Sequence, residues 1–471
     1  MNSFLNDKLK WYGKNLNQYF LDTIYDTDKL MIELPQEKWF KINPTRGMKK
    51  AICCYDLART HSKISDFLIN VYGETEYNRA TIDRKTMRFS RRNVAAGGGL
   101  YPNLIYILIK TNKVVNIYQF DPALCVLRVI GRVAAVESEF EENKCYFIST
   151  LYYFRNWLKY RYFGYRLMNV DSGYLLAGFY SQVIKSRLDG EICLSSKLFN
   201  LAKEYIKIDL KKENICFVVK INDINLLDSI KNLNKVCKYQ IFDDWDTLDI
   251  DLYETIEKAA LDQQYDICEK IVGDLKFDIF NSKKIERNRI SPGGAAMQSI
   301  LPINKDLLLN TIHTLNILIK DVEYLICDLN IYIYIKKIEG FEVGIYRISL
   351  EKDGGLEFVR PVYEDLQVIL KKHNFNFDQT PALIFVGNNP CFDFSKCLES
   401  EFKFVQLKVG FLSHLISVAA AFNDCYTHPI LGFDSKLCEK KIGEKNILNL
   451  IAFSDAKTLD RQRLSYRKDE T

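Results

Sequence analysis

Two neighbouring side chains that can exchange protons, Lys159 and Tyr160, lie in a segment dense in cations and aromatic rings. From position 157 it reads Trp-Leu-Lys-Tyr-Arg-Tyr-Phe-Gly-Tyr-Arg. A lysine with a depressed pKa, or a tyrosine beside a cation, can remove a proton from a substrate. The same residues would suit base stacking and phosphate contacts on a nucleic acid, or a helix entry whose arginines extend into water. The segment alone leaves these three interpretations open.

A run of three glycines at 97–99 is the second candidate, preceded by Arg-Arg-Asn-Val-Ala-Ala and followed by Leu-Tyr-Pro. Glycines allow positive φ and let a ligand lie against backbone N–H groups. A phosphate-binding P-loop is disfavoured because no Gly-Lys-Ser/Thr follows. A dinucleotide-binding turn is disfavoured because Tyr-Pro leads into a strand. The loop is either a flexible turn or a ligand cradle.

The second half of the chain offers phosphate-binding types. Arg289 and Ser291 combine a guanidinium fork with a hydroxyl, and Arg461 and Arg463 are paired cations near the C-terminus. Residues 429–434 form the turn-like hexapeptide Pro-Ile-Leu-Gly-Phe-Asp. Taken alone, Ser291 fits a Ser-Pro-Gly-Gly turn and the two arginines fit solvated surface.

Together these segments resemble the SagB/McbC-type azoline dehydrogenases of the FMN-dependent nitroreductase superfamily. Arg92, Gly98, Tyr101 and Pro102 fall in register with the motif Arg-x-x-Pro-Ser-x-Gly-x-x-Tyr-Pro, whose Pro-Ser pair is replaced here by two alanines. The segment at 159 resembles the Lys-Tyr…Tyr-Arg…Gly segment of that family. The resemblance implies Lys159 and Tyr160 as catalytic residues and FMN contacts at Arg92, Ala95, Ala96, Gly97, Gly98 and Tyr101.

In the second half, the resemblance implies an FMN phosphate site and a turn beside the isoalloxazine ring. The implied residues are Arg289, Ser291, Arg461 and Arg463 for the phosphate, and Pro429, Leu431 and Gly432 for the turn. Ile290 stands where the family has a second arginine. Because each half lacks what the other has, we expect one FMN per chain in an internal pseudo-dimer; a homodimer would provide the same complement.

Strand and helix patterns alternate in both halves, which predicts an α+β fold. Strands are expected at 104–110, 215–221, 331–337, 342–348, 381–387 and 447–453, and helices at 306–318, 406–422 and from an N-cap at Asp171 or Ser172. The resemblance implies two tandem nitroreductase-like α-β-α sandwich domains. We expect an N-terminal domain at 1–222, an acidic helical connector on the surface at 223–283, and a C-terminal domain at 284–471.

Composition sets wider bounds on function. The 471 residues exceed the usual size of one domain, and a net charge of +5 does not imply a nucleic-acid or membrane partner. Thirteen cysteines without a Cys-x-x-Cys pair favour reduced thiols in the cytoplasm. The five isolated histidines predict no metal centre, and the N-terminus lacks the apolar core of a secretory signal.

The resemblance implies an enzyme that oxidises azoline rings to thiazoles or oxazoles in a ribosomally made peptide after cyclodehydration. The setting would be thiopeptide, microcin-like or other bacteriocin biosynthesis, with oxygen reoxidising the flavin. Its partners would be the azoline-containing precursor peptide and a cyclodehydratase or leader-binding protein. Two alternatives stay open: an NAD(P)H-dependent nitro or quinone reductase, and a non-catalytic scaffold or peptide-binding subunit, which the losses at Ala95, Ala96 and Ile290 would suit.

Overall fold

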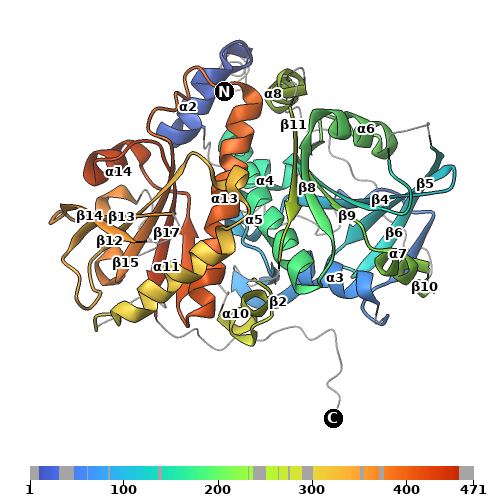
Figure 1. Ribbon diagram of the computed structural model, residues 1–471. Coiled ribbons are helices and arrows are strands. Elements are labelled where there is room, and N and C mark those ends of the chain that lie inside the picture. Colours follow the sequence, from blue (N-terminus) through green and yellow to red (C-terminus); the bar gives the residue numbers. More distant parts are fainter. Residues whose placement is uncertain are drawn as a thin grey trace. The chain divides into compact units, whose positions relative to one another are not determined.

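The computed structural model describes most of the chain, and its secondary-structure elements are shown in Figure 1. The described residues are 10–30, 47–60, 62–82, 85–135, 140–231, 233–236, 251–261, 263, 265–273, 276–288, 301–350, 355–370 and 376–455. They fall into two units. The first unit holds residues 10–16 and 47–272, and the second holds residues 17–30 and 273–455.

The first unit is built on a nine-stranded sheet in which neighbouring strands are antiparallel. Their order is β10-β1-β6-β5-β4-β7-β9-β8-β11. The strands are β1 (Cys53–Asp56), β4 (Asn103–Thr111), β5 (Val114–Asp121), β6 (Val126–Ala134), β7 (Cys145–Tyr152), β8 (Gly190–Ser195), β9 (Glu213–Ile221), β10 (Lys235–Val236) and β11 (Asp266–Ile271). Every residue of β7 is buried, as expected for a central strand. A separate hairpin pairs β2 (Glu74–Ile82) with β3 (Lys85–Arg92) and leads into the glycine loop.

The helices of this unit pack around a long buried helix, α5 (Gly164–Lys185). The others are α3 (Lys63–Tyr72), α4 (Tyr153–Tyr160), η4 (Arg161–Phe163), α6 (Ser196–Ile206), α7 (Ile224–Lys231) and α8 (Asp251–Leu261). Because α5 contacts β4, β7 and β9 as well as α3 and α4, it forms the layer between the sheet and the candidate site.

The second unit has a six-stranded antiparallel sheet in the order β14-β13-β12-β15-β17-β16. The strands are β12 (Leu329–Ile335), β13 (Gly344–Ile348), β14 (Leu356–Pro361), β15 (Ala382–Asn388), β16 (Tyr426–Ile430) and β17 (Ile447–Ser454). The helices are α2 (Leu16–Tyr25), η1 (Thr27–Lys29), α9 (Phe277–Phe280), α10 (Lys283–Asn288), α11 (Lys305–Ile319), α12 (Glu323–Ile326), η6 (Gln367–Ile369), η7 (Phe377–Gln379), α13 (Glu399–Phe422) and α14 (Ser435–Ile442).

The helix α13 forms the centre of this unit's helical layer. It packs against α11 on one side and against β15, β16 and β17 on another. By length and composition it could also cross a membrane, and it is the one helix among the described residues that could. However, 89% of its most apolar stretch is buried, and the core helices of globular units pass the same test.

The predicted α+β class is confirmed, and most predicted elements are found. The expected strands correspond to β4, β9, β12, β13, β15 and β17, and two of the expected helices correspond to α11 and α13. The helix expected to start at Asp171 or Ser172 starts instead at Gly164. Both residues lie inside α5, where the Ser172 hydroxyl donates to the Met168 carbonyl (3.0 Å) and so needs no helix end.

The expected domain boundaries differ from the grouping of the described residues. Within the expected connector, β10 and β11 are strands of the first unit's sheet, and α8 buries Tyr253, Ile256 and Glu257. Near the N-terminus, residues 17–30 belong to the second unit. There Phe20 stacks on Phe402 with ring centroids 4.1 Å apart, and Asn17 Nδ2 donates to the Ser395 carbonyl (2.6 Å).

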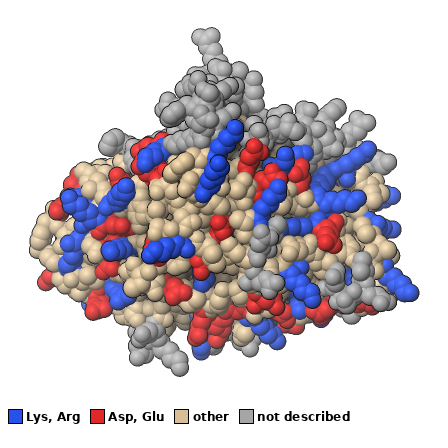
Figure 2. All heavy atoms as spheres, turned by 90° about the horizontal axis from the view of Figure 1, so that it is seen from above, with Lys and Arg blue, Asp and Glu red and all other residues tan. Residues whose placement is uncertain are grey.

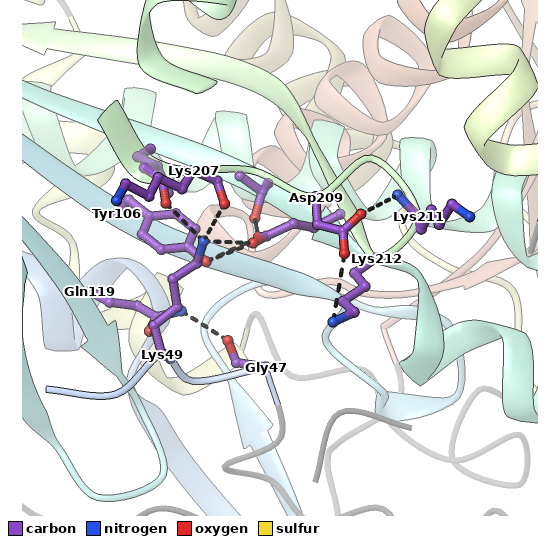
Figure 3. Close-up of polar contacts among 11 residues, drawn as sticks. Gly47, Lys49, Tyr106, Gln119, Lys207, Asp209, Lys211 and Lys212 are labelled. Carbon is purple, nitrogen blue, oxygen red and sulfur yellow. Dashed lines mark hydrogen bonds and ion pairs between the residues drawn. The ribbon is translucent and has the colours of Figure 1, made fainter. Parts of the chain in front are cut away.

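A polar cluster holds the segment around Gly47 and Lys49 to the sheet of the first unit (Figure 3). The Lys49 N–H donates to Gln119 Oε1 (2.7 Å), and the Gln119 amide donates to the Gly47 carbonyl (3.1 Å). Lys49 Nζ lies 3.4 Å from the buried Glu213 carboxylate. That carboxylate also accepts from the hydroxyls of Tyr106 and Thr150. Because the protein itself satisfies these oxygens, the cluster is structural.

The hairpin between β5 and β6 depends on a fully buried ion pair. Asp121 Oδ2 accepts from Arg128 Nη2 (2.6 Å) and Nε (3.1 Å), and both side chains are 0% exposed. Asp121 Oδ1 accepts the backbone N–H groups of Ala123 and Leu124, both at 3.1 Å. One carboxylate therefore closes the turn and neutralises the arginine.

Replacing Asp121 by alanine (Asp121→Ala) should lower the free energy of unfolding by about 3–5 kcal/mol, because it leaves a buried guanidinium uncompensated. Urea titration followed by circular dichroism measures this loss. Arg59→Ala is the control, since Arg59 is 87% exposed and lies 3.8 Å from Asp56. That change should cost less than about 1 kcal/mol. Equal losses in the two variants would contradict the role given to the buried pair.

Candidate functional site

The glycine loop forms a single turn, η3 (Gly97–Gly99), between β3 and β4. Gly98 and Gly99 have φ values of +63° and +68°, in the left-handed region that favours glycine. The Gly99 N–H donates to the Ala96 carbonyl (3.0 Å) and closes the turn. Ala95 and Ala96 are half-buried, whereas Gly98 and Gly99 are exposed. The loop therefore presents bare backbone at its tip.

The side chains of Lys159 and Tyr160 lie against this loop. A β-carbon added at Gly98 would be 2.5 Å from Lys159 Nζ and 2.6 Å from the Tyr160 hydroxyl oxygen. One added at Gly97 would be 2.5 Å from Leu167 Cδ2 on α5, whereas Gly99 has no such neighbour within 4 Å. The structure thus brings the predicted catalytic pair and the predicted ligand loop together within the first unit.

Lys159 and Tyr160 occupy the last turn of α4, which packing holds in place. The helix ends at Arg161, whose φ is +50° and whose backbone N–H donates to the Trp157 carbonyl. The Tyr253 hydroxyl donates to the Arg161 carbonyl (2.6 Å), and the Arg161 guanidinium carbon lies 3.9 Å from the centroid of the Trp157 ring. These contacts fix the direction in which the pair points.

Burial of the following aromatic residues disfavours a nucleic-acid surface here. Tyr162, Phe163 and Tyr165 are all buried, so their rings are not free to stack on bases. On the face of the molecule shown in Figure 2, acidic side chains lie among the basic ones.

The Tyr160 hydroxyl stays protonated around neutral pH. Burial raises the pKa of Tyr160 well above its ordinary value, and the nearby Asp171 carboxyl raises it further. The Lys159 ammonium nitrogen lies 5.1 Å from the centroid of the Tyr160 ring. Tyr160 therefore offers a hydrogen-bond donor beside the loop.

Asp171 is the residue of this region whose role the sequence did not indicate. Its side chain is 2% exposed, and Oδ1 accepts the Gly97 N–H (2.9 Å). Oδ2 receives a long hydrogen bond from Asn156 Nδ2 (3.5 Å) on α4. Burial raises the pKa of Asp171 to about 8, and these two donors act in the opposite direction. A carboxyl group within an otherwise apolar stretch of sequence was the available signal.

Arg92 and Tyr101 fasten the two ends of the loop. Arg92 is buried, and its guanidinium carbon lies 4.1 Å from the centroid of the Tyr72 ring and 4.6 Å from that of Tyr101. The Tyr101 hydroxyl accepts the Arg92 N–H (2.9 Å), and the Tyr101 carbonyl accepts from Arg155 Nη1 (2.5 Å). The structure places both residues beneath the loop, where they support its backbone.

In the second unit, the first two residues of the predicted turn, Pro429 and Ile430, are the end of β16, and the other four link β16 to α14. Phe433 is buried in the core, and the Asp434 side chain caps α14 by accepting the Leu437 N–H (2.9 Å). Gly432 is exposed, and an added β-carbon there would have no neighbour within 4 Å. Pro429 and Leu431 are half-buried. The turn is therefore anchored on one side and open at its glycine.

Four residues of the expected phosphate site lie outside the described residues. They are Arg289, Ser291, Arg461 and Arg463. Their assignment to a flavin phosphate stays a prediction from the sequence.

Comparison with solved structures identifies the fold. A candidate nitroreductase from Anabaena variabilis is similar with a TM-score of 0.66 and 15% identity, over 94% of this chain and 100% of its own. The similarity to an E. coli microcin synthetase McbBCD complex with truncated pro-MccB17 bound has a TM-score of 0.26 and 14% identity, over 41% of this chain and 74% of that chain. For a candidate nitroreductase from Ralstonia eutropha the TM-score is 0.24, with 12% identity, over 38% and 95%.

The last two similarities are too slight to carry an argument. No protein-family model matches the sequence, and no curated protein matches it. The first similarity spans nearly the whole chain, so the fold is that of the nitroreductases, as predicted.

Gly98→Ala and Gly99→Ala separate backbone strain from side-chain contact. Both substitutions place alanine at a left-handed φ, which costs about 1–2 kcal/mol. Only Gly98→Ala must also displace Lys159 and Tyr160. We expect Gly98→Ala to lower the free energy of unfolding, measured by urea titration, by clearly more than Gly99→Ala does. Equal losses would show that the pair does not pack on Gly98.

Asp171→Asn should make the protein less sensitive to rising pH. Below about pH 4 the wild-type carboxyl is protonated in both the folded and the unfolded chain. Between there and about pH 8 only the unfolded chain is ionised, so wild-type stability falls as pH rises. The stability of the variant relative to wild type should therefore increase from pH 5 to 8, by about 1.4 kcal/mol per pH unit at most, and then level off. Urea titrations at several pH values test this, and a pH-independent difference would contradict it.

Proposed function

We propose that this protein is an FMN-dependent dehydrogenase that oxidises azoline rings to thiazoles or oxazoles in a ribosomally made peptide. The observation that carries the proposal is the contact of Lys159 and Tyr160 with Gly98 in a protein of nitroreductase fold. A base, a hydrogen-bond donor and an open backbone loop meet at one place. Fold alone does not define a reaction, so the argument rests on these residues.

The exposed glycine loop fits the flavin that the fold implies. Gly99 is exposed, and a β-carbon added there would have no neighbour within 4 Å, so a planar ring can approach its backbone. At Gly98 that place is already occupied by Lys159 and Tyr160. Ala95 and Ala96 lack the hydroxyl of the family motif, so their backbone would make the contact. In the second unit, the exposed Gly432 also has no side chain, and a β-carbon added there would have no neighbour within 4 Å. When bound, FMN supplies the acceptor for the hydride that leaves the ring.

We assign the base to Lys159 and the donor to Tyr160. Aromatising an azoline removes one proton and one hydride. The proton leaves a ring carbon, and an unprotonated Lys159 Nζ would take it. Tyr160 is held neutral by its raised pKa, so it donates a hydrogen bond that orients the ring. Their positions at the end of a packed helix allow both groups to act on a ring lying beside them at the loop.

The peptide reaches this site with its azoline rings already formed, so we propose that the protein acts after a cyclodehydratase. A leader-binding protein would be a further partner, and the cytoplasm is the proposed location. We propose one FMN per chain, with the phosphate held by Arg289, Ser291, Arg461 and Arg463.

Activity tests the assignment directly. Purified protein should contain FMN and convert azoline peptides to azoles, seen by mass spectrometry as the loss of two hydrogen atoms per ring. Lys159→Ala should lower this rate by about 10²–10⁴-fold, the usual contribution of a general base. Lys258→Ala is the control, because Lys258 is 63% exposed and its ammonium group lies 2.8 Å from Glu254 on the same helix. Tyr160→Phe should lower the rate less than Lys159→Ala.

Two outcomes would overturn the proposal. One is colourless protein together with unchanged azole formation in a Lys159→Ala, Tyr160→Ala double variant. The other is flavin that NADPH reduces rapidly for nitro or quinone substrates while azoline peptides remain unchanged. Flavin extraction gives the stoichiometry, and two FMN per chain would contradict the single site.

A further inference from the structure

We propose that Asp171 is a positioning residue that joins the glycine loop to the helix carrying Lys159 and Tyr160. This inference rests on the proposed function for its catalytic consequence, but not for its structural content. Asp171 acts through Gly97 on one side and Asn156 on the other.

The loop side of this link is short and direct. Oδ1 accepts the Gly97 N–H at 2.9 Å, and Gly97 immediately precedes the glycine on which the catalytic pair packs. Leu167, one turn before Asp171 on α5, would be 2.5 Å from a β-carbon at Gly97. The loop therefore packs against α5 at Gly97, where the Asp171 carboxyl oxygen holds the backbone N–H.

The helix side of the link uses Asn156, which precedes Lys159 by three residues and Tyr160 by four on α4. Residues at these separations lie on one face of a helix, one turn apart. Asn156 is 0% exposed, and its Oδ1 has no hydrogen-bond partner among the described residues. The Asn156 side-chain amide can be turned by 180°, which interchanges its oxygen and nitrogen, and the hydrogen-bond partners decide between the two orientations. If the amide is turned, a neutral Asp171 can donate its proton to Asn156 Oδ1.

A neutral carboxyl suits this bridge because it accepts on one oxygen and donates from the other. The raised pKa of Asp171, about 8, agrees with that state at neutral pH. The titratable groups that face it are Tyr72 of α3 and Tyr160 of α4, whose pKa values are both raised by burial. Neither tyrosine ionises near pH 8.

The alternative is that Asp171 is only a buried polar residue tolerated by the core. A leucine at this place would avoid the cost of burying a carboxyl group, which is large when the group is not fully satisfied. Asparagine would keep both hydrogen bonds, because its Oδ1 accepts from Gly97 and its Nδ2 donates to Asn156. The two substitutions therefore separate positioning from mere volume.

Hydrogen exchange of the loop is the primary test. In Asp171→Leu, the peptide covering residues 94–101 should exchange at least ten times faster than in wild type. Asp171→Asn should restore wild-type exchange. Ser172→Ala is the matched control, since Ser172 is the adjacent buried residue on α5 and bonds to Met168 and Asn103, not to the loop. It should leave loop exchange unchanged.

Catalysis provides the second readout. Asp171→Leu should lower kcat for azoline oxidation at least ten-fold with little change in KM. In wild type, ionisation of Asp171 near pH 8 should change the rate. Asp171→Asn should keep kcat and should not show that change. If Asp171→Leu does not fold, Asn156→Leu breaks the same link from α4 and should give the same two effects.

The outcomes distinguish this inference from the proposed function. Folded Asp171→Leu and Asn156→Leu proteins with wild-type loop exchange would overturn the positioning role, whatever the activity. Asp171→Asn as defective as Asp171→Leu would overturn the hydrogen-bond bridge. Protein that shows the exchange differences but neither binds FMN nor oxidises azolines would refute the proposed function and leave the positioning role intact.

Discussion

The absence of a side chain at Gly98 is the constraint on which the candidate site depends. Lys159 and Tyr160 occupy the space that a β-carbon would need, and the backbone there has a φ that other residues adopt only with strain. The surrounding residues hold the loop where the Lys159 and Tyr160 side chains can contact Gly98. Arg92 packs between two tyrosine rings beneath the loop, and Asp171 holds the loop to α5. A rigid support is needed because reacting groups must be held to within fractions of an ångström.

Much of the fold could be predicted from the sequence because its central strands are continuous apolar runs. The strand predicted at 104–110 is such a run, and it is found as β4. The helix predicted at 406–422 has apolar residues at helical spacing, and it is found within α13. The loop and the Lys159–Tyr160 pair were also predicted, although their contact was not. The residues expected to bind the flavin phosphate were predicted from motif resemblance alone and lie outside the described residues.

The remaining features could not be predicted because they depend on tertiary partners. Asp171 and Ser172 look like helix starters, yet inside α5 their polar groups are satisfied by Gly97 and Met168. The acidic segment after residue 223 looks like solvated surface, but α8 buries Glu257, which accepts from the Tyr165 hydroxyl (2.9 Å). Local pattern cannot show such a partner, because it lies far away in the sequence.

The early helix α2 belongs to a unit whose other elements come much later in the chain. Its Asn17 bonds to Ser395, 378 positions away, and its Tyr25 hydroxyl donates to Glu439. A ribosome adds about 5–20 residues per second, so α2 is synthesised roughly 20–80 seconds before those partners are. Its apolar face, including Phe20, must stay unaggregated during that interval. The second unit can therefore complete its core only after the segment carrying Glu439 has been made.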